Sequence, residues 1–146
     1  MSSDEEFLRE TCDTDQTYTT TKLFCFPAMS NYNGKKYPLK WISQIKTAST
    51  SNFVLLDAAA FVGTNYLNLT EFQPDFVVLS FYKMFGYPTG LGALLIKNTS
   101  EKILKRNYFG GGTVDLALVR KNMSFMRKPI SQKYEDGTID YLGKYG

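Results

Sequence analysis

Two charged residues stand at the ends of two apolar stretches of the sequence. Asp57 follows the run "NFVLL", and Lys83 ends the segment "PDFVVLSFYK". Continuous apolar runs of this length predict strands of a parallel sheet that is covered on both faces. The carboxyl ends of such strands meet at one edge, where open α/β sheets bind ligands. Burying an ammonium group costs free energy unless the group is paired or takes part in chemistry. The position of Lys83 therefore indicates that its amine has a partner or a chemical role.

An amine and a carboxylate at one edge of a sheet suggest two alternatives. Pyridoxal 5′-phosphate (PLP) chemistry needs a lysine that forms a Schiff base, and an acidic group that keeps the pyridine nitrogen protonated. A structural ion pair between Asp57 and Lys83 explains the same pattern without any chemistry. The pattern by itself leaves both alternatives open.

The composition excludes several other chemistries. The 146-residue chain contains no histidine and two cysteines, so Ser-His-Asp and Cys-His systems and four-ligand zinc sites are excluded, and no metal site is expected. Cys12 lies in a polar segment. Cys25 stands between Phe24 and Phe26, which predicts a buried and inert thiol rather than one that forms a persulfide. Any reaction must therefore use lysine, carboxylate, tyrosine or thiol.

The distribution of charge and hydrophobicity limits the partners and the compartment. The 17 basic and 14 acidic residues are dispersed, so the sequence predicts no binding of nucleic acid. No apolar run reaches the roughly 20 residues of a membrane helix, so no membrane association is expected. The acidic and polar first residues differ from a secretory signal, which favours the cytosol. We expect a polar leader over residues 1–22 and a partial domain over 23–146.

The order of the remaining patterns predicts an α/β fold with a mainly parallel sheet, because strand-like runs alternate with helix-like ones. A proline followed by an apolar stripe at helical spacing predicts the longest helix. The expected strands cover 23–31, 52–60, 74–83 and 90–97, and the strand at 90–97 is expected to be buried. The expected helices cover 37–49 and a short segment from Ser100, and 64–73 is expected to hold a short helix or a turn.

Five segments resemble the class V aminotransferase superfamily, which includes the cysteine desulfurases, in order and approximate spacing. They are "SNYNG" (30–34), "LLDAAAFV" (55–62), "LSFYKMFGYPTGLGALLI" (79–96), "YFGGGTV" (108–114) and "QKYEDGTIDYL" (132–142). Within the superfamily, the chain is most similar to the amino-terminal domain of molybdenum cofactor sulfurases. The resemblance covers residues 23–142 and implies the central part of the large domain of a fold-type I PLP-dependent transferase.

The resemblance also implies roles for particular residues. Lys83 matches the lysine that forms the Schiff base, and Asp57 matches the acid that faces the pyridine nitrogen. Asn31 matches an asparagine beside the ring hydroxyl, although without the resemblance it reads as a turn residue. Ser80 matches a phosphate-binding serine, or is a simple strand-end hydroxyl. Thr138 matches a threonine that reaches the phosphate of the neighbouring subunit, which implies a homodimer.

Two positions depart from the general desulfurase pattern. Tyr82 stands where those enzymes have a histidine before the lysine, and Ala60 stands where they have a glutamine. Both changes favour the sulfurase branch, and Tyr82 is a candidate cofactor-binding residue.

The implied function is a PLP-dependent reaction that removes sulfur from L-cysteine and transfers it to the molybdenum cofactor. The phosphate-binding turn, the ring that stacks on PLP and the persulfide thiol of this family have no counterparts in the chain, so we expect a piece of a larger fold. The alternative is a non-catalytic remnant that at most binds a partner. The triple glycine at 110–112 lacks the lysine and hydroxyl of a P-loop, which favours a flexible turn.

Overall fold

The computed structural model describes residues 20–86 and 90–137. These residues form two compact units that divide after Ser100. The elements of the first unit are β1 (Lys22–Pro27), α2 (Lys40–Ala48), β2 (Asn52–Asp57), α3 (Leu69–Phe72), β3 (Phe76–Ser80), α4 (Phe81–Phe85) and β4 (Gly92–Ile96), followed by a 3₁₀ helix, Asn98–Ile103, that crosses the boundary. The second unit contains β5 (Val114–Leu118), β6 (Met123–Met126) and α5 (Ile130–Tyr134).

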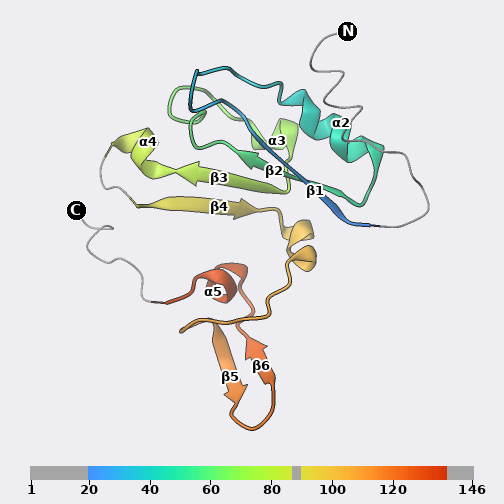
Figure 1. Ribbon diagram of the computed structural model, residues 1–146, viewed down its shortest axis with the longest axis vertical. Coiled ribbons are helices and arrows are strands. Elements are labelled where there is room, and N and C mark those ends of the chain that lie inside the picture. Colours follow the sequence, from blue (N-terminus) through green and yellow to red (C-terminus); the bar gives the residue numbers. More distant parts are fainter. Residues whose placement is uncertain (1–19, 87–89, 138–146) are drawn as a thin grey trace. The chain divides into compact units, whose positions relative to one another are not determined.

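The first unit is built on a four-stranded sheet of order β1-β2-β3-β4 (Figure 1). β1, β2 and β3 are parallel, and β4 pairs with β3 in the antiparallel direction. Pro27 pairs with Asp57, and Asp57 pairs with Val78, so the three parallel strands end at almost the same level. The prediction of an α/β fold with a mainly parallel sheet is confirmed.

Helix α2 covers one face of the sheet through a narrow apolar stripe. Trp41, Ile42 and Ile45 are its buried residues, as their spacing along a helix requires. The Trp41 ring meets the Phe26 ring edge to face at 5.6 Å between centroids. The complete core cluster consists of Phe26, Ala28, Trp41, Ile42, Ile45, Val54, Leu56, Ala58, Phe61 and Val77.

The opposite face of the sheet is much less covered. In β2, Val54 and Leu56 are buried on the α2 side, whereas Phe53 and Leu55, which alternate with them, are only half-buried. Leu94 in β4 is 52% exposed. The prediction of strands covered on both faces is therefore wrong for the described part of the chain, because α2 and its neighbours pack on one side.

Two of the predicted strands differ in detail from the structure. The strand predicted over 74–83 ends at Ser80, and Lys83 lies in the short helix α4, which ends at Gly86 with φ 85°. The strand predicted as buried over 90–97 is β4, an edge strand that exposes Leu94 and Leu95. Both errors arise because an apolar run does not show where the chain turns or which strand lies at the edge.

A buried aspartate joins the amino-terminal end of β3 to its neighbours. The Asp75 carboxylate accepts hydrogen bonds from Lys46 Nζ (2.7 Å), Ser100 Oγ (2.7 Å) and Val54 N (2.9 Å). Burial raises the pKa of Asp75, but these hydrogen bonds together outweigh burial and hold the pKa below its usual value. Asp75 thus ties α2, β2 and the 3₁₀ helix together.

The second unit is small and largely exposed. β5 and β6 form an antiparallel hairpin, in which Leu116 and Phe125 are each about half exposed. Thr113, directly before β5, is the exception and is fully buried. Because the hairpin contributes little to a hydrophobic core, polar contacts must hold much of this unit in its conformation.

Candidate functional site

The carboxyl edge of the three parallel strands gathers four of the predicted site residues. Asp57 ends β2, Ser80 ends β3, Lys83 follows in α4, and Asn31 lies in the turn after β1. Because Asp57 pairs with Val78 and side chains alternate, Asp57 and Ser80 project from the same face of the sheet, the less covered one.

Lys83 reaches back to the turn after β1. Its Nζ donates a hydrogen bond to Asn31 Oδ1 at 2.8 Å, across 52 positions of sequence. The turn that carries Asn31 is closed by Gly34 N, which donates to Ser30 O, and Gly34 has a φ of 69° that favours glycine. The backbone therefore holds the Asn31 amide in place to accept from the lysine.

Asp57 does not pair with Lys83. Its Oδ1 accepts from the backbone N of Ala59 at 3.0 Å, and its side chain is exposed. Among residues 20–86 and 90–137, the ion pairs join other partners. The alternative of a structural Asp57–Lys83 ion pair is therefore wrong for this structure, and both groups remain available to a ligand.

The helix that carries Lys83 is held by a close approach between two backbones. A Cβ added to Gly63 would lie 2.8 Å from Lys83 O, so only glycine allows the loop after β2 to approach α4 this closely. Sequence reasoning missed Gly63, and the only signal was a glycine six positions after Asp57. This contact links the segment after Asp57 to the backbone of Lys83.

The remaining sequence-predicted residues have different outcomes. Tyr82 is 43% exposed, and Lys83 Nζ lies 6.0 Å from the centroid of its ring. Ala60 is half-buried in the loop after β2. Thr138 lies outside the described residues. Cys25 is exposed, not buried, because it projects from the less covered face of the edge strand β1, so the prediction of a buried thiol is wrong.

The donor set fits PLP on chemical grounds. A primary amine that is not held in an ion pair, an exposed carboxylate, a hydroxyl and an amide oxygen lie at one sheet edge, and PLP needs an amine for its aldehyde and an acid for its ring nitrogen. Metal chemistry has no such support, since the described residues contain no group of three or more Cys, Asp or Glu side chains able to hold a metal ion. None of the described helices is long and apolar enough to cross a membrane.

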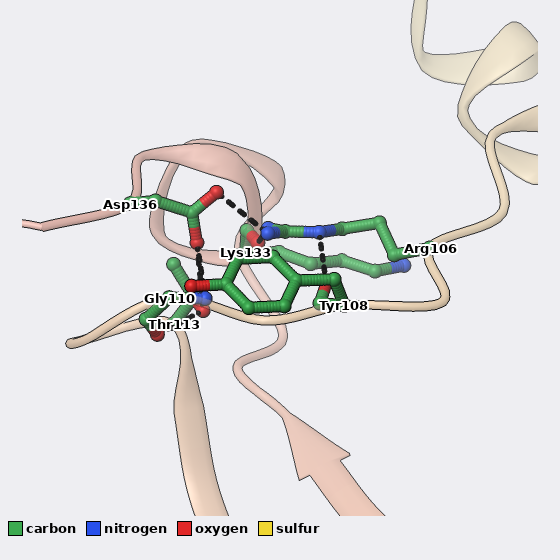
Figure 2. A network of polar contacts seen from close by, with 6 residues as sticks. All are labelled: Arg106, Tyr108, Gly110, Thr113, Lys133 and Asp136. Carbon is green, nitrogen blue, oxygen red and sulfur yellow. Dashed lines mark hydrogen bonds and ion pairs between the residues drawn. The ribbon is translucent and has the colours of Figure 1, made fainter.

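A second polar cluster, in the second unit, was also missed by sequence reasoning. The Asp136 carboxylate accepts from Arg106 and from the backbone N of Gly110 (Figure 2). The hydrogen bond from Arg106 and then that from Gly110 hold the pKa of Asp136 below its usual value. The glycine run at 110–112 is thus held by a carboxylate. The available signal was the aspartate beside Gly137 in "YEDGT", a segment already singled out for Thr138.

Comparison with known proteins agrees with this fold. The family model of the class V aminotransferases matches residues 2–146, so the chain belongs to the class V aminotransferase family, whose members use PLP. The chain is 44% identical over 144 residues to molybdenum cofactor sulfurase 3 of Aedes aegypti, with 94% of this chain and 19% of the relative aligned. It is 50% identical over 127 residues to molybdenum cofactor sulfurase of Bos taurus, with 82% and 14% aligned.

Solved structures show the same fold. The apo cysteine desulfurase of Thermococcus onnurineus NA1 superposes with a TM-score of 0.75 and 22% identity, over 98% of this chain and 34% of that one. The chain spans less than a fifth of the length of the two sulfurases and about a third of the desulfurase. The predicted family is confirmed.

Proposed function

We propose that this chain is part of a PLP-dependent molybdenum cofactor sulfurase, in which Lys83 binds the cofactor covalently. One observation carries the proposal: Lys83 Nζ lies at the carboxyl edge of the parallel strands and donates to a neutral amide oxygen at 2.8 Å, not to a carboxylate. An amine held this way is oriented by a hydrogen bond and not by an ion pair. The similarity to the sulfurases of Aedes aegypti and Bos taurus supports the reaction class.

The proposed roles follow from the chemistry of each group. When bound, PLP supplies an electron sink. Lys83 holds the cofactor through its amine, and Asp57 holds the proton on the ring nitrogen, for which an exposed carboxylate outside an ion pair is suited. Ser80 donates its hydroxyl to the phosphate, and Asn31 accepts or donates at the ring hydroxyl once the lysine has released it.

The finer parts of the proposal rest on the family. Tyr82 lies beside Lys83 and is assigned to the cofactor site, and Thr138 is assigned to the phosphate of a second copy, so that the active form is a homodimer. L-cysteine is the proposed sulfur donor and the molybdenum cofactor the acceptor. The polar first residues favour the cytosol as the compartment.

The test is to reduce the PLP-treated protein with borohydride and to map the modified peptide. We expect the label on Lys83, none on a Lys83→Ala variant, and none on Lys83→Arg, because guanidinium keeps the charge but cannot condense with the aldehyde. Lys97→Ala is the matched control, since Lys97 is also half-buried and hydrogen-bonded to a side-chain amide, that of Gln73. Label on Lys97 or another lysine with Lys83 unmodified would end the assignment.

Asp57→Ala separates binding from catalysis. This variant should still take the label on Lys83, but in a protein that carries the family's persulfide thiol it should lose most sulfur release from cysteine, because the ring nitrogen loses its acid. A protein that takes no PLP at all, and whose Leu23 and Leu94 face is covered by a partner, would instead support the alternative of a non-catalytic, partner-binding piece. Leu23 and Leu94 are 51% and 52% exposed, which is the observation that favours this second candidate.

A further inference from the structure

The loop that follows β2, residues 58–65, starts at one of the two residues proposed for chemistry and contacts the other. Asp57 directly precedes this loop, and Gly63 within it approaches the backbone of Lys83. A Cβ added to Gly63 would lie 2.8 Å from the carbonyl oxygen of Lys83, a distance that real Cβ atoms essentially never show. The φ of Gly63 lies outside the left-handed region, so the close approach, and not the backbone conformation, is what favours glycine here.

The loop itself is firmly attached to the core. Ala58 is fully buried, and its backbone N donates to Val78 O in β3 at 3.0 Å. Phe61 is 8% exposed, and its backbone N and that of Val62 donate to Ala58 O. The carbonyl oxygen of Phe61 in turn accepts from the backbone N of Asn65 at 2.9 Å and from its Nδ2 at 3.1 Å. The loop can therefore move little without a loss of core packing.

Helix α4, on the other side of the contact, is much less restrained. It has five residues, none of which is buried, and Phe85 at its end is 72% exposed. A Cβ at position 63 could be accommodated only if one of the two backbones moved, and α4 is the one with less packing to lose. Such a movement would carry Lys83 away from Asn31, to which its Nζ donates at 2.8 Å.

We propose that Gly63 is a positioning residue: it lets the backbone of α4 lie directly against the loop after β2, and so sets how far the Lys83 amine reaches toward Asn31 at the carboxyl edge of the sheet. The consequence for PLP rests on the proposed function of Lys83, but the contact between the two backbones does not. Gly63 has no side chain to touch a reacting atom, so its effect must pass through the position of α4.

Competitive acetylation tests the position of the amine without any cofactor. The wild-type chain and Gly63→Ala are treated with a trace of acetic anhydride, and the modified lysines are measured by peptide mass mapping. Lys97 is the internal reference, since its amine also donates to a side-chain amide oxygen. We expect the acetylation of Lys83 relative to Lys97 to rise about fivefold in Gly63→Ala, the size of one net hydrogen bond, because the amine leaves Asn31. Asn31→Ala should give a similar rise, and the double variant should add nothing further, because both changes break one contact.

Capture of PLP should change in the opposite direction. The yield of PLP fixed on Lys83 by borohydride should fall about tenfold in Gly63→Ala, because a displaced amine meets the bound aldehyde in a poorer geometry. General loosening of the fold would raise the acetylation of Lys97 as well. Gly111→Ala is the matched control, since Gly111 also lacks a left-handed φ and has no atom within 4 Å of an added Cβ. Both measurements should stay at their wild-type values in this control.

The possible results separate the positioning role from the proposed function. An unchanged acetylation ratio in Gly63→Ala, or unchanged capture of PLP by a variant whose wild type captures it, would overturn the positioning role. A Gly63→Ala protein whose Trp41 fluorescence shows an unfolded core would also overturn it, because the glycine would then serve the fold as a whole. A wild-type chain that takes no PLP would refute the proposed function, and the acetylation ratio would then still decide whether Gly63 positions Lys83.

Discussion

Asp75 in the first unit and Asp136 in the second have the same kinds of hydrogen-bond donors but differ in their exposure to solvent. Each carboxylate accepts from one basic side chain, one hydroxyl and one backbone N–H. Asp75 is 3% exposed at the amino-terminal end of β3, whereas Asp136 is exposed and follows α5 in the second unit. The free-energy cost of removing such a carboxylate depends on how far its hydrogen-bond donors are exposed to solvent. We therefore expect Asp75 to stabilise the whole first unit and Asp136 only to orient a loop.

The largest effect should come from the hydrophobic core of the first unit. Ile45→Ala should lower the free energy of unfolding of the first unit by about 3 kcal/mol, because Ile45 is fully buried and leaves a cavity. Leu118→Ala in β5 of the second unit is the control, and it should change the free energy of unfolding of the first unit by less than about 0.5 kcal/mol. Urea denaturation followed by the fluorescence of Trp41, the only tryptophan, reports on the first unit. Similar losses for both variants would contradict the contrast between the two units.

A smaller but still large effect should follow from removing the buried carboxylate. Asp75→Ala leaves the hydroxyl of Ser100 and the amide of Val54 buried without an acceptor, and we expect a loss of about 2 kcal/mol by the same measurement. Asp75→Asn keeps an acceptor oxygen and should lose less. A loss for Asp75→Ala no greater than that for Asp115→Ala, an exposed acid, would show that burial does not set the cost.

The pH dependence of stability should separate the two aspartates further. The pKa of Asp75 is lowered in the folded protein, so its contribution is fully present above its ordinary pKa of about 4 and is lost as the pH falls through the lower folded value. The difference in stability between wild type and Asp75→Asn should therefore be constant near neutral pH and shrink below about pH 4. A difference that grows in acid would mean that the folded pKa is raised.

The smallest global effect should belong to Asp136. Its pKa is lowered in the same direction, but the carboxylate is in contact with solvent, which screens its pairing with Arg106. Asp136→Asn should shift the Trp41 unfolding midpoint by no more than the error of the measurement between pH 4 and 8, while local hydrogen exchange at Gly110 increases. A clear shift of the midpoint would show that the second unit stabilises the first.

Much of the fold was predictable because hydrophobic periodicity is a local property. The strand runs at 52–60 and 74–83 and the stripe of Leu39, Ile42 and Ile45 placed β2, β3 and α2 to within a few residues. The errors concerned where strands end and how well they are covered: the chain enters a helix at Phe81, and Cys25 lies on the less covered face of the sheet. Those features depend on the partners of each strand, which no local pattern contains.

The sequence by itself determined the family, the α/β class and the candidates Asp57 and Lys83, because their residue types and the runs before them are written in the chain. Only the tertiary structure decided which residues these side chains contact. It showed that Lys83 donates a hydrogen bond to Asn31 and not to Asp57. It also showed that Gly63 lies against the backbone of Lys83, and that the Asp136 carboxylate accepts from the backbone N of Gly110. Each of these contacts joins residues 20 or more positions apart, and their existence depends on how strands and loops are brought together in space.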